Sequence, residues 1–136
     1  MREIEFCGCS VRDNKWYYGD LRQDSDLKKY YIEGYNYYSG ETGLEREPFC
    51  EEVYPQSVGE YIGHHDKNEN KIYEGDIINI KIYDVDYIAT VECIFPECRF
   101  AYCVAIDGDY SYPEEFECDD IEVIDKVFEK RKYNND

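Results

Sequence analysis

The chain has 136 residues and a formal net charge of −17, from 15 basic and 32 acidic residues. Its apolar fraction of 43 % is enough for a hydrophobic core, which argues against global disorder. The excess of carboxylates disfavours direct binding of nucleic acid, because contacts with phosphates need cations, and it would attract basic partners instead.

The thiols and the N-terminus indicate where the protein resides. Seven cysteines are present, an odd number. The opening Met-Arg-Glu-Ile-Glu-Phe lacks the apolar segment of a signal peptide, and no run approaches the roughly 18 apolar residues of a membrane helix. We therefore expect a cytoplasmic protein without membrane association, with reduced thiols in place of a disulfide framework.

Short β-type runs dominate the first half of the chain, and no long stretch has the apolar period of a helix. The runs are bounded by Gly, Pro, Asn and Asp, which are turn residues. Strands are expected at 4–7, 16–21, 29–37 and 51–54, with a loop at 38–50.

Residues 58–82 are the most informative stretch. They predict a strand, a polar turn at 66–70 and a second strand that begins after a glycine. Gly59, Gly63 and Gly75 are expected where the backbone needs positive φ or close approach. The second strand places alternate isoleucines on one face, namely Ile78, Ile80 and Ile82.

Three further strands are expected at 87–95, 99–106 and 121–128. Alternation predicts one buried face on each of the first two, formed by Tyr87, Ala89, Val91, Cys93 and Phe95 and by Phe100, Tyr102, Val104 and Ile106. Residues 113–116, which begin with Pro113, predict a single helical turn, and 130–136 predict a frayed tail. Strands spaced about ten residues apart indicate a barrel-like or sandwich β architecture.

His64, His65 and Asp66 form the one cluster of histidines. Adjacent side chains on an extended segment point to opposite faces, so His64 and His65 would not chelate one ion together. In a turn, one histidine and Asp66 could bind a metal with a third ligand such as Glu74 or Asp76. The simpler interpretation is a pair of exposed turn histidines.

The cysteines fit a metal site poorly. A zinc site of Cys7, Cys9, Cys98 and Cys103 can be imagined, but zinc ribbons space each ligand pair as C-x2–4-C, which these positions do not follow. Small buried apolar residues are the better interpretation for most of the seven.

No catalytic motif is present: the chain lacks a P-loop, G-x-G-x-x-G, G-x-S-x-G and H-E-x-x-H. A carboxylate pair of the glycosidase type stays open, although with 32 carboxylates some pair always looks plausible. Tyrosines gather at 16–21 and 29–38, interleaved with acids more than with cations. Strand packing or a protein interface therefore explains them better than base stacking does.

Several blocks resemble the YopX-like family of small phage and prophage proteins. The opening resembles M-R-E-I-x-F-R-G, residues 16–21 resemble W-x-Y-G-x-L, and residues 120–124 resemble D-I-E-V-I. The strongest block, residues 58–78, resembles V-G-Q-Y-T-G, D-K-N and I-Y-E-G-D-I-V. The matched motif positions, interpreted as structural, are Trp16, Gly19, Val58, Gly59, Tyr61, Gly63, Asp66, Ile72, Tyr73, Glu74, Gly75, Asp76 and Ile77.

Some positions depart from the family pattern. Cys7 and Cys9 replace basic residues, and His64 replaces an apolar one, which weakens both metal interpretations. Asn70 replaces the turn glycine of the family pattern, and asparagine is the next best residue for a left-handed position. Asp125 replaces a glycine and puts a turn after Ile124 in doubt.

The resemblance implies an origin in a phage, or in a prophage of a bacterial host, and an all-β fold. The expected fold has an SH3-like barrel-type unit around residues 55–128, additional N-terminal strands and little helix. Residues 1–129 form either one YopX-like domain or two small β subdomains, about 1–55 and 56–129, followed by the tail at 130–136.

The leading functional hypothesis is a non-enzymatic accessory protein that binds a protein partner or itself, without catalytic, cofactor or metal residues. The 58–82 block then has a scaffold role, with Asp76 bonded to the turn backbone, and Gly75→Val is expected to unfold the chain. One alternative is an acidic DNA-mimic decoy for a host DNA-binding protein, since residues 107–125 hold nine carboxylates and no Lys or Arg. The other is a metal-dependent hydrolase around His64, His65 and Asp66.

The tyrosines predict assembly. A chain this short cannot bury every tyrosine of its N-terminal strands in one core, and tyrosine suits interfaces. We therefore expect a homo-oligomer, most simply a twofold dimer, formed by the N-terminal half. The tyrosines concerned are Tyr17, Tyr18, Tyr30, Tyr31, Tyr35 and Tyr37.

Overall fold

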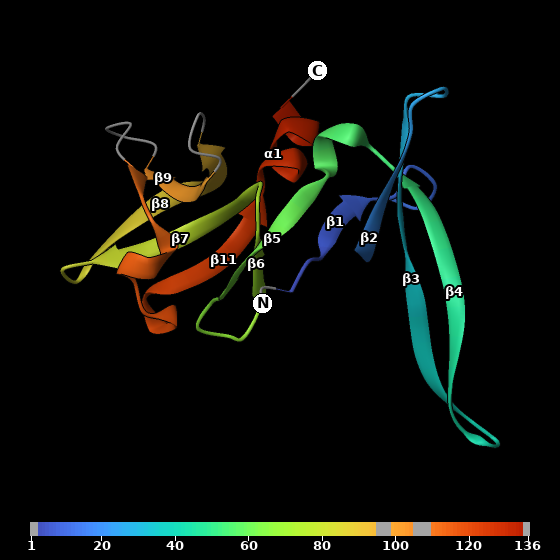
Figure 1. Ribbon diagram of the computed structural model, residues 1–136. Coiled ribbons are helices and arrows are strands. Elements are labelled where there is room, and N and C mark those ends of the chain that lie inside the picture. Colours follow the sequence, from blue (N-terminus) through green and yellow to red (C-terminus); the bar gives the residue numbers. More distant parts are fainter. Residues whose placement is uncertain (1–2, 95–98, 105–109, 135–136) are drawn as a thin grey trace. The chain divides into compact units, whose positions relative to one another are not determined.

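The computed structural model describes residues 3–94, 99–104 and 110–134 (Figure 1). The chain forms two compact units. The N-terminal unit comprises Ile4–Glu60, and the C-terminal unit comprises Tyr61–Asp136 together with Met1–Glu3. The division falls inside one strand, two residues after its start.

The N-terminal unit is an antiparallel sheet in which the strands are ordered β4-β3-β2-β1, with the start of β5 beside β1. Its core consists of Cys7, Cys9, Ile32 and Val53, all at most 1 % exposed. A 3-10 turn, Pro55–Ser57, leads into β5, and the Ser57 hydroxyl accepts a hydrogen bond from the Cys9 backbone N–H at 2.8 Å. The strands are β1 (Phe6–Cys9), β2 (Trp16–Asp24), β3 (Lys29–Gly40), β4 (Gly43–Val53) and β5 (Gly59–His65).

Gly19 allows β2 and β3 to meet. A Cβ atom at this position would lie 2.2 Å from the backbone oxygen of Glu33, a distance that no side chain tolerates. The close approach explains why a motif glycine stands inside a strand, where glycine otherwise weakens pairing.

The C-terminal unit contains a five-stranded antiparallel sheet in the order β10-β9-β8-β7-β11, and the short pair of β5 with β6. Two 3-10 turns, Pro113–Glu115 and Cys118–Asp120, connect β10 to β11. The elements are β6 (Lys71–Tyr73), β7 (Asp76–Ile82), β8 (Val85–Ile94), β9 (Arg99–Val104), β10 (Tyr110–Ser111), β11 (Ile121–Lys126) and the helix α1 (Val127–Asn134).

The core of the C-terminal unit follows the predicted alternation. Ile78 and Ile80 are fully buried, and Ile82 packs against the same cluster. Tyr102 and Val104 from β9 and Ala89 and Val91 from β8 complete it, as expected from their parity. Cys93 departs from the prediction: it is exposed, close to the end of β8. Two more of the predicted core residues, Phe95 and Ile106, lie outside the described residues.

Three sequence-based expectations about elements are corrected. The predicted loop at 38–50 is part of a hairpin, because the turn occupies only the residues between Gly40 and Gly43, and Gly43 supplies a φ of 117°. The predicted last strand ends at Lys126. Residues 127–134 form a helix, where a strand end and a frayed tail were expected.

The all-β class is confirmed, whereas the SH3-like detail stays a prediction. In the described part of the chain, the five-stranded sheet has two open edges, β10 and β11, so it does not close into a barrel. The single helical turn predicted at Pro113 is present as a 3-10 turn. No described helix is long and apolar enough to cross a membrane.

Candidate functional site

The turn between β5 and β6 is organised by the buried carboxylate of Asp66. Its Oδ1 accepts hydrogen bonds from the backbone N–H groups of Asn68 and Asn70, at 2.9 and 2.8 Å. Its Oδ2 accepts one from Val123 of β11, at 2.9 Å. Burial opposes ionisation, but these backbone donors outweigh it and hold the pKa of Asp66 below its usual value. Asp66 thus joins the turn to a strand distant in sequence.

The two histidines lie at the end of β5, before the turn, and only His65 is exposed, so the interpretation as two exposed turn histidines is wrong for His64. They do not build the metal site considered from the sequence. Nδ1 of His65 lies 3.4 Å from the Tyr61 hydroxyl, and the two rings meet edge to face. The carboxylate oxygens of Asp66 are already occupied by N–H donors. Across the described residues, no group of three or more His, Cys, Asp and Glu side chains could hold a metal ion. The hydrolase alternative around His64, His65 and Asp66 therefore gains no geometric support.

Asp76 holds the second turn, between β6 and β7. Its Oδ2 accepts a hydrogen bond from the Tyr73 backbone N–H at 2.8 Å, as the sequence predicts. Its Oδ1 accepts one from Nζ of Lys126 at 2.6 Å. Burial is the largest influence and raises the pKa of Asp76, although the charge of Lys126 opposes the rise. Both contacts tie β7 to its neighbours.

The motif glycines behave differently from one another. Gly63 and Gly75 have φ values of 91° and 92°, which confirms the need for positive φ. Gly59 has no positive φ and pairs with Cys7 in the sheet. The left-handed position of the turn is taken by Glu69, with φ 65°, and not by Asn70. Asn70 instead bonds Asp66 through its backbone N–H.

Burial of the family-motif residues agrees with a structural interpretation. Trp16, Val58 and Glu74 are half-buried, and none of the thirteen is exposed. At Asp125 the strand continues, because β11 absorbs the irregularity as a shift of register between Val123 and Asp125. The fully buried motif residues are Gly59, Tyr61, Asp66, Ile72, Tyr73, Asp76 and Ile77.

The cysteines are only partly as predicted. Cys7 and Cys9 are buried apolar residues of the N-terminal sheet. Cys50, Cys93 and Cys118 are exposed, so the prediction that most are buried is wrong. The imagined zinc ligand Cys98 lies outside the described residues.

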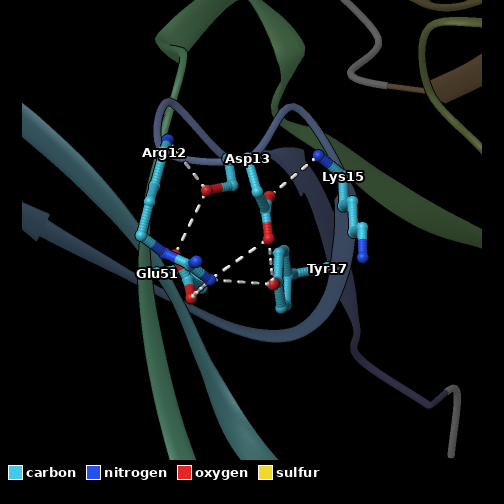
Figure 2. A network of polar contacts seen from close by, with 6 residues as sticks. Arg12, Asp13, Lys15, Tyr17 and Glu51 are labelled. Atoms are coloured by element: carbon cyan, nitrogen blue, oxygen red, sulfur yellow. Dashed lines mark hydrogen bonds and ion pairs between the residues drawn. The ribbon is translucent and has the colours of Figure 1, made fainter.

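A network of polar contacts, not singled out from the sequence, fixes the turn between β1 and β2 (Figure 2). Arg12 Nη2 and Glu51 Oε1 form an ion pair of 2.5 Å, and the Tyr17 hydroxyl donates to Asp13 Oδ2 at 2.7 Å. The hydrogen bond from Tyr17 lowers the pKa of Asp13, and the one from Arg12 lowers the pKa of Glu51. Arg12 and Glu51 are distant in sequence, so no local pattern could reveal the network.

The distal parts of β3 and β4 form a two-stranded ribbon. β2 pairs with β3 only over Lys29–Glu33, whereas the pairing of β3 with β4 continues to Gly40 opposite Gly43. Residues 34–49 are therefore called the ribbon (Figure 1). Most of their side chains are exposed. Among the described strands, no third strand covers either edge of the ribbon.

The two faces of the ribbon differ in chemistry. Alternation places Tyr35 and Tyr37 on one face, with their cross-strand partners Pro48 and Arg46 and with Leu44. We call these five residues the tyrosine face. Tyr37 is 63 % and Leu44 75 % exposed. The opposite, acidic face carries Asn36, Tyr38, Glu45 and Glu47.

Both arginines on and beside the tyrosine face lie against aromatic rings. The Arg46 guanidinium lies 4.3 Å from the ring centroid of Tyr35. At the root of the ribbon, Arg22 forms an ion pair with Glu33 and lies 4.2 Å from the ring centroid of Tyr31. Such guanidinium–ring contacts cover the ring faces in part, and the guanidinium keeps its positive charge.

The expectation that the N-terminal tyrosines cannot all be buried is confirmed. Tyr18, Tyr35 and Tyr37 are exposed, whereas Tyr17, Tyr30 and Tyr31 are half-buried. Tyr38, part of the tyrosine cluster predicted at 29–38, is exposed as well. Leu44 is also exposed and was missed as a surface candidate, because it falls in the region expected to be a loop.

A family model described as YopX protein matches residues 5–132. The chain belongs to the YopX family. Among solved structures, this YopX family member is similar to the crystal structure of protein EF1440 from Enterococcus faecalis, with a TM-score of 0.58 and 15 % identity. The likeness covers 98 % of this chain and 99 % of that chain and shows the fold alone. A comparison with curated proteins gave no match.

Proposed function

We propose that this YopX family member is a non-enzymatic accessory protein of phage or prophage origin that acts in the host cytoplasm by binding. Its binding surface is the tyrosine face of the ribbon, and the occupant of that surface is a second copy of the chain. The observation that carries the proposal is a two-stranded ribbon with exposed tyrosines and no covering strand.

A two-stranded ribbon of this length, which no other described strand covers, needs contacts with a partner to be stable. An isolated two-stranded hairpin is at best marginally stable in water, and a third strand or a covering surface is needed for independent stability. The ribbon exposes Tyr35, Tyr37 and Leu44 on one face. Burying this face in an interface would supply the missing cover.

The composition of the tyrosine face fits a protein interface. Tyrosine and arginine are enriched in interfaces, and the ion pair of Arg22 with Glu33 at the root of the ribbon adds no net charge beside this face. A second copy is favoured over a basic partner because this face carries Arg46 and no unpaired carboxylate, whereas the acidic face carries Glu45 and Glu47. Two tyrosine faces can meet where two acidic faces would repel.

Paired serine variants on adjacent tyrosines test the proposal. Tyr37→Ser removes a ring from the tyrosine face, and Tyr38→Ser removes one from the acidic face of the same strand, so both change β propensity equally. Sedimentation velocity at micromolar concentration and 0.15 M salt should give a dimer for the natural chain. Tyr37→Ser should weaken dimerisation on the order of tenfold, and Tyr38→Ser by far less.

Two results would contradict the proposal. One is a mass near the 16.3 kDa of a single chain for the natural protein. The other is an equal loss of dimer in Tyr37→Ser and Tyr38→Ser, which would assign the effect to strand propensity and not to the tyrosine face.

A further inference from the structure

The C-terminal unit contains a cavity of about 300 Å³ that no part of the proposed function uses. It is bounded by the end of β5, by β9 and by the two 3-10 turns, all among the described residues. Its lining includes the rings of Tyr102 and Phe116, whose centroids are 6.0 Å apart, and the apolar Pro113 and Ile121. Its volume is at the lower end of that of ligand sites.

Tyr102 presents an unpartnered hydroxyl. The residue is 1 % exposed, and its hydroxyl makes no hydrogen bond with any residue of the described part of the chain. Among these residues, no fully buried side-chain oxygen or nitrogen lacks a partner, so the hydroxyl must reach open space, and the cavity is the space that Tyr102 lines. Burial, followed by the charge of Glu114, raises the pKa of Tyr102, so its oxygen stays protonated and can accept a hydrogen bond.

The cavity has one carboxylate among its described lining residues. Glu117 lines it, is exposed and forms no ion pair with the described residues. No Lys or Arg is among the lining residues that the structure describes. His64, His65 and Cys118 also line the cavity. Aromatic rings, an acceptor hydroxyl and an unpaired carboxylate in one lining are complementary to a cation on an apolar stem.

We propose that this cavity binds an arginine side chain of a basic protein partner. The guanidinium is planar, stacks on aromatic rings and presents several donors, so it can contact Phe116, Tyr102 and Glu117 together. The proposal does not depend on the ribbon, which belongs to the other unit.

The chain already uses the same chemistry beside the cavity. The Arg99 guanidinium lies 3.6 Å from the ring centroid of Tyr112, and its Nη2 is 3.0 Å from Oε2 of Glu114. Arg99 thereby contacts an aromatic ring and a carboxylate of its own chain. Glu117 and the half-buried ring of Phe116 offer the equivalent pair of groups to an arginine from outside.

Nuclear magnetic resonance titration of the whole chain tests the inference with two peptides, acetyl-Gly-Arg-Gly-amide and the same peptide with neutral citrulline. The arginine peptide should shift the amide signals of residues 63–65 and 113–121 in a saturable way at about millimolar concentration, as suits a single side chain. Glu117→Gln should raise its Kd about fivefold or more, as expected for a charged hydrogen bond. Tyr102→Phe should raise the Kd less.

A matched control separates the cavity from the general acidity. Glu69→Gln removes one carboxylate from an exposed turn of the same unit that does not line the cavity, and it should leave the Kd nearly unchanged. Equal effects of Glu69→Gln and Glu117→Gln, equal binding of the citrulline peptide, or shifts spread evenly over the unit would each overturn the proposal. Preserved signal dispersion in each variant shows that it remains folded.

Discussion

Asp66 and Asp76 are both buried carboxylates, yet their surroundings act on ionisation in opposite directions. Backbone N–H groups surround Asp66 and lower its pKa, whereas burial dominates at Asp76 and raises its pKa. The ionised form of Asp66 therefore stabilises the fold above the pKa of the unfolded chain, and this contribution is lost as pH falls through the folded-state pKa. Asp76 acts in the opposite direction. Its contribution to the stability of the fold is complete below the pKa of the unfolded chain and is lost as pH rises through the raised folded-state pKa.

The variant Asp66→Asn tests this assignment. At pH 7 it should lower the free energy of unfolding by about 1–3 kcal/mol, because an amide NH₂ replaces an acceptor that serves N–H donors. The difference from the natural chain should begin to shrink below about pH 4, where the carboxyl of the unfolded chain is protonated, and should shrink further as pH falls through the lowered folded-state pKa. Urea unfolding between pH 3 and pH 7 measures it, with Glu69→Gln as control. A difference independent of pH would contradict the role of the charge.

At Gly75, the backbone conformation alone accounts for the need for glycine. It has φ of 92°, and a Cβ there would meet nothing within 4 Å. Backbone strain is thus the main penalty, about 1–3 kcal/mol, which is below the stability of most domains. The unfolding expected of Gly75→Val from the sequence is therefore reduced to a loss of stability.

Three substitutions at Gly75 form a graded test. Asn tolerates positive φ best, Ala less well and the β-branched Val least. Urea unfolding should rank the losses as Gly75→Asn, then Gly75→Ala, then Gly75→Val, with the last near 3 kcal/mol. Equal losses for Asn and Val would show that something other than φ requires the glycine.

At the scale of elements, the sequence predicts those features that depend on neighbouring residues, such as strand alternation and turn hydrogen bonds. The alternation of Ile78 and Ile80 and the Asx chemistry of Asp66 are local patterns, and both were confirmed. The bond from Val123 to Asp66 joins residues 57 apart, and no local pattern could indicate it. Among the candidate surfaces, the tyrosines were identified from the sequence, whereas the cavity at Tyr102 is assembled from β5, β9, β11 and the two 3-10 turns, which no local pattern brings together.

The ribbon and α1 were mispredicted for identifiable reasons. Gly40, Gly43 and Pro48 suggest a loop, yet two glycines flank a two-residue turn and proline is tolerated on an edge strand. β4 is such an edge in its sheet. The eight residues of α1 are too short to show a helical apolar period, and a helix of this length depends on its tertiary context.

Shortening the ribbon tests its independence from the rest of its unit. Replacing residues 35–48 by Asn-Gly would join Gly34 to Phe49, which face each other across β3 and β4, through a two-residue hairpin turn. Because β2 pairs only up to Glu33, the remaining sheet should keep its circular dichroism and cooperative unfolding. The dimer should be lost. A shortened chain that fails to fold would show that the ribbon is part of the core, and one that still dimerises would place the interface elsewhere.

At the scale of the whole molecule, charge is divided unevenly between the units. Ile4–Glu60 holds 6 basic and 12 acidic residues, a net −6, which leaves −11 of the total −17 for the other unit. Bringing two such chains together costs electrostatic energy at any interface. The five residues of the tyrosine face include no carboxylate, which reduces this penalty locally but does not remove the long-range repulsion.

Salt should therefore strengthen the dimer. Screening lengths fall from about 10 Å at 0.1 M to about 3 Å at 1 M, which weakens repulsion between the acidic chains while burial of the tyrosine face is unaffected or favoured. Sedimentation at 0.05 M and 0.5 M sodium chloride should show a lower dissociation constant at the higher salt.

The DNA-mimic alternative predicts the opposite salt dependence for a different complex. Attraction between the carboxylates and a basic host protein weakens as salt rises. A dimer that dissociates as salt rises would show that ion pairs hold it, against the proposed tyrosine interface. A host DNA-binding protein retained by this chain at low salt and released at high salt would instead support the decoy.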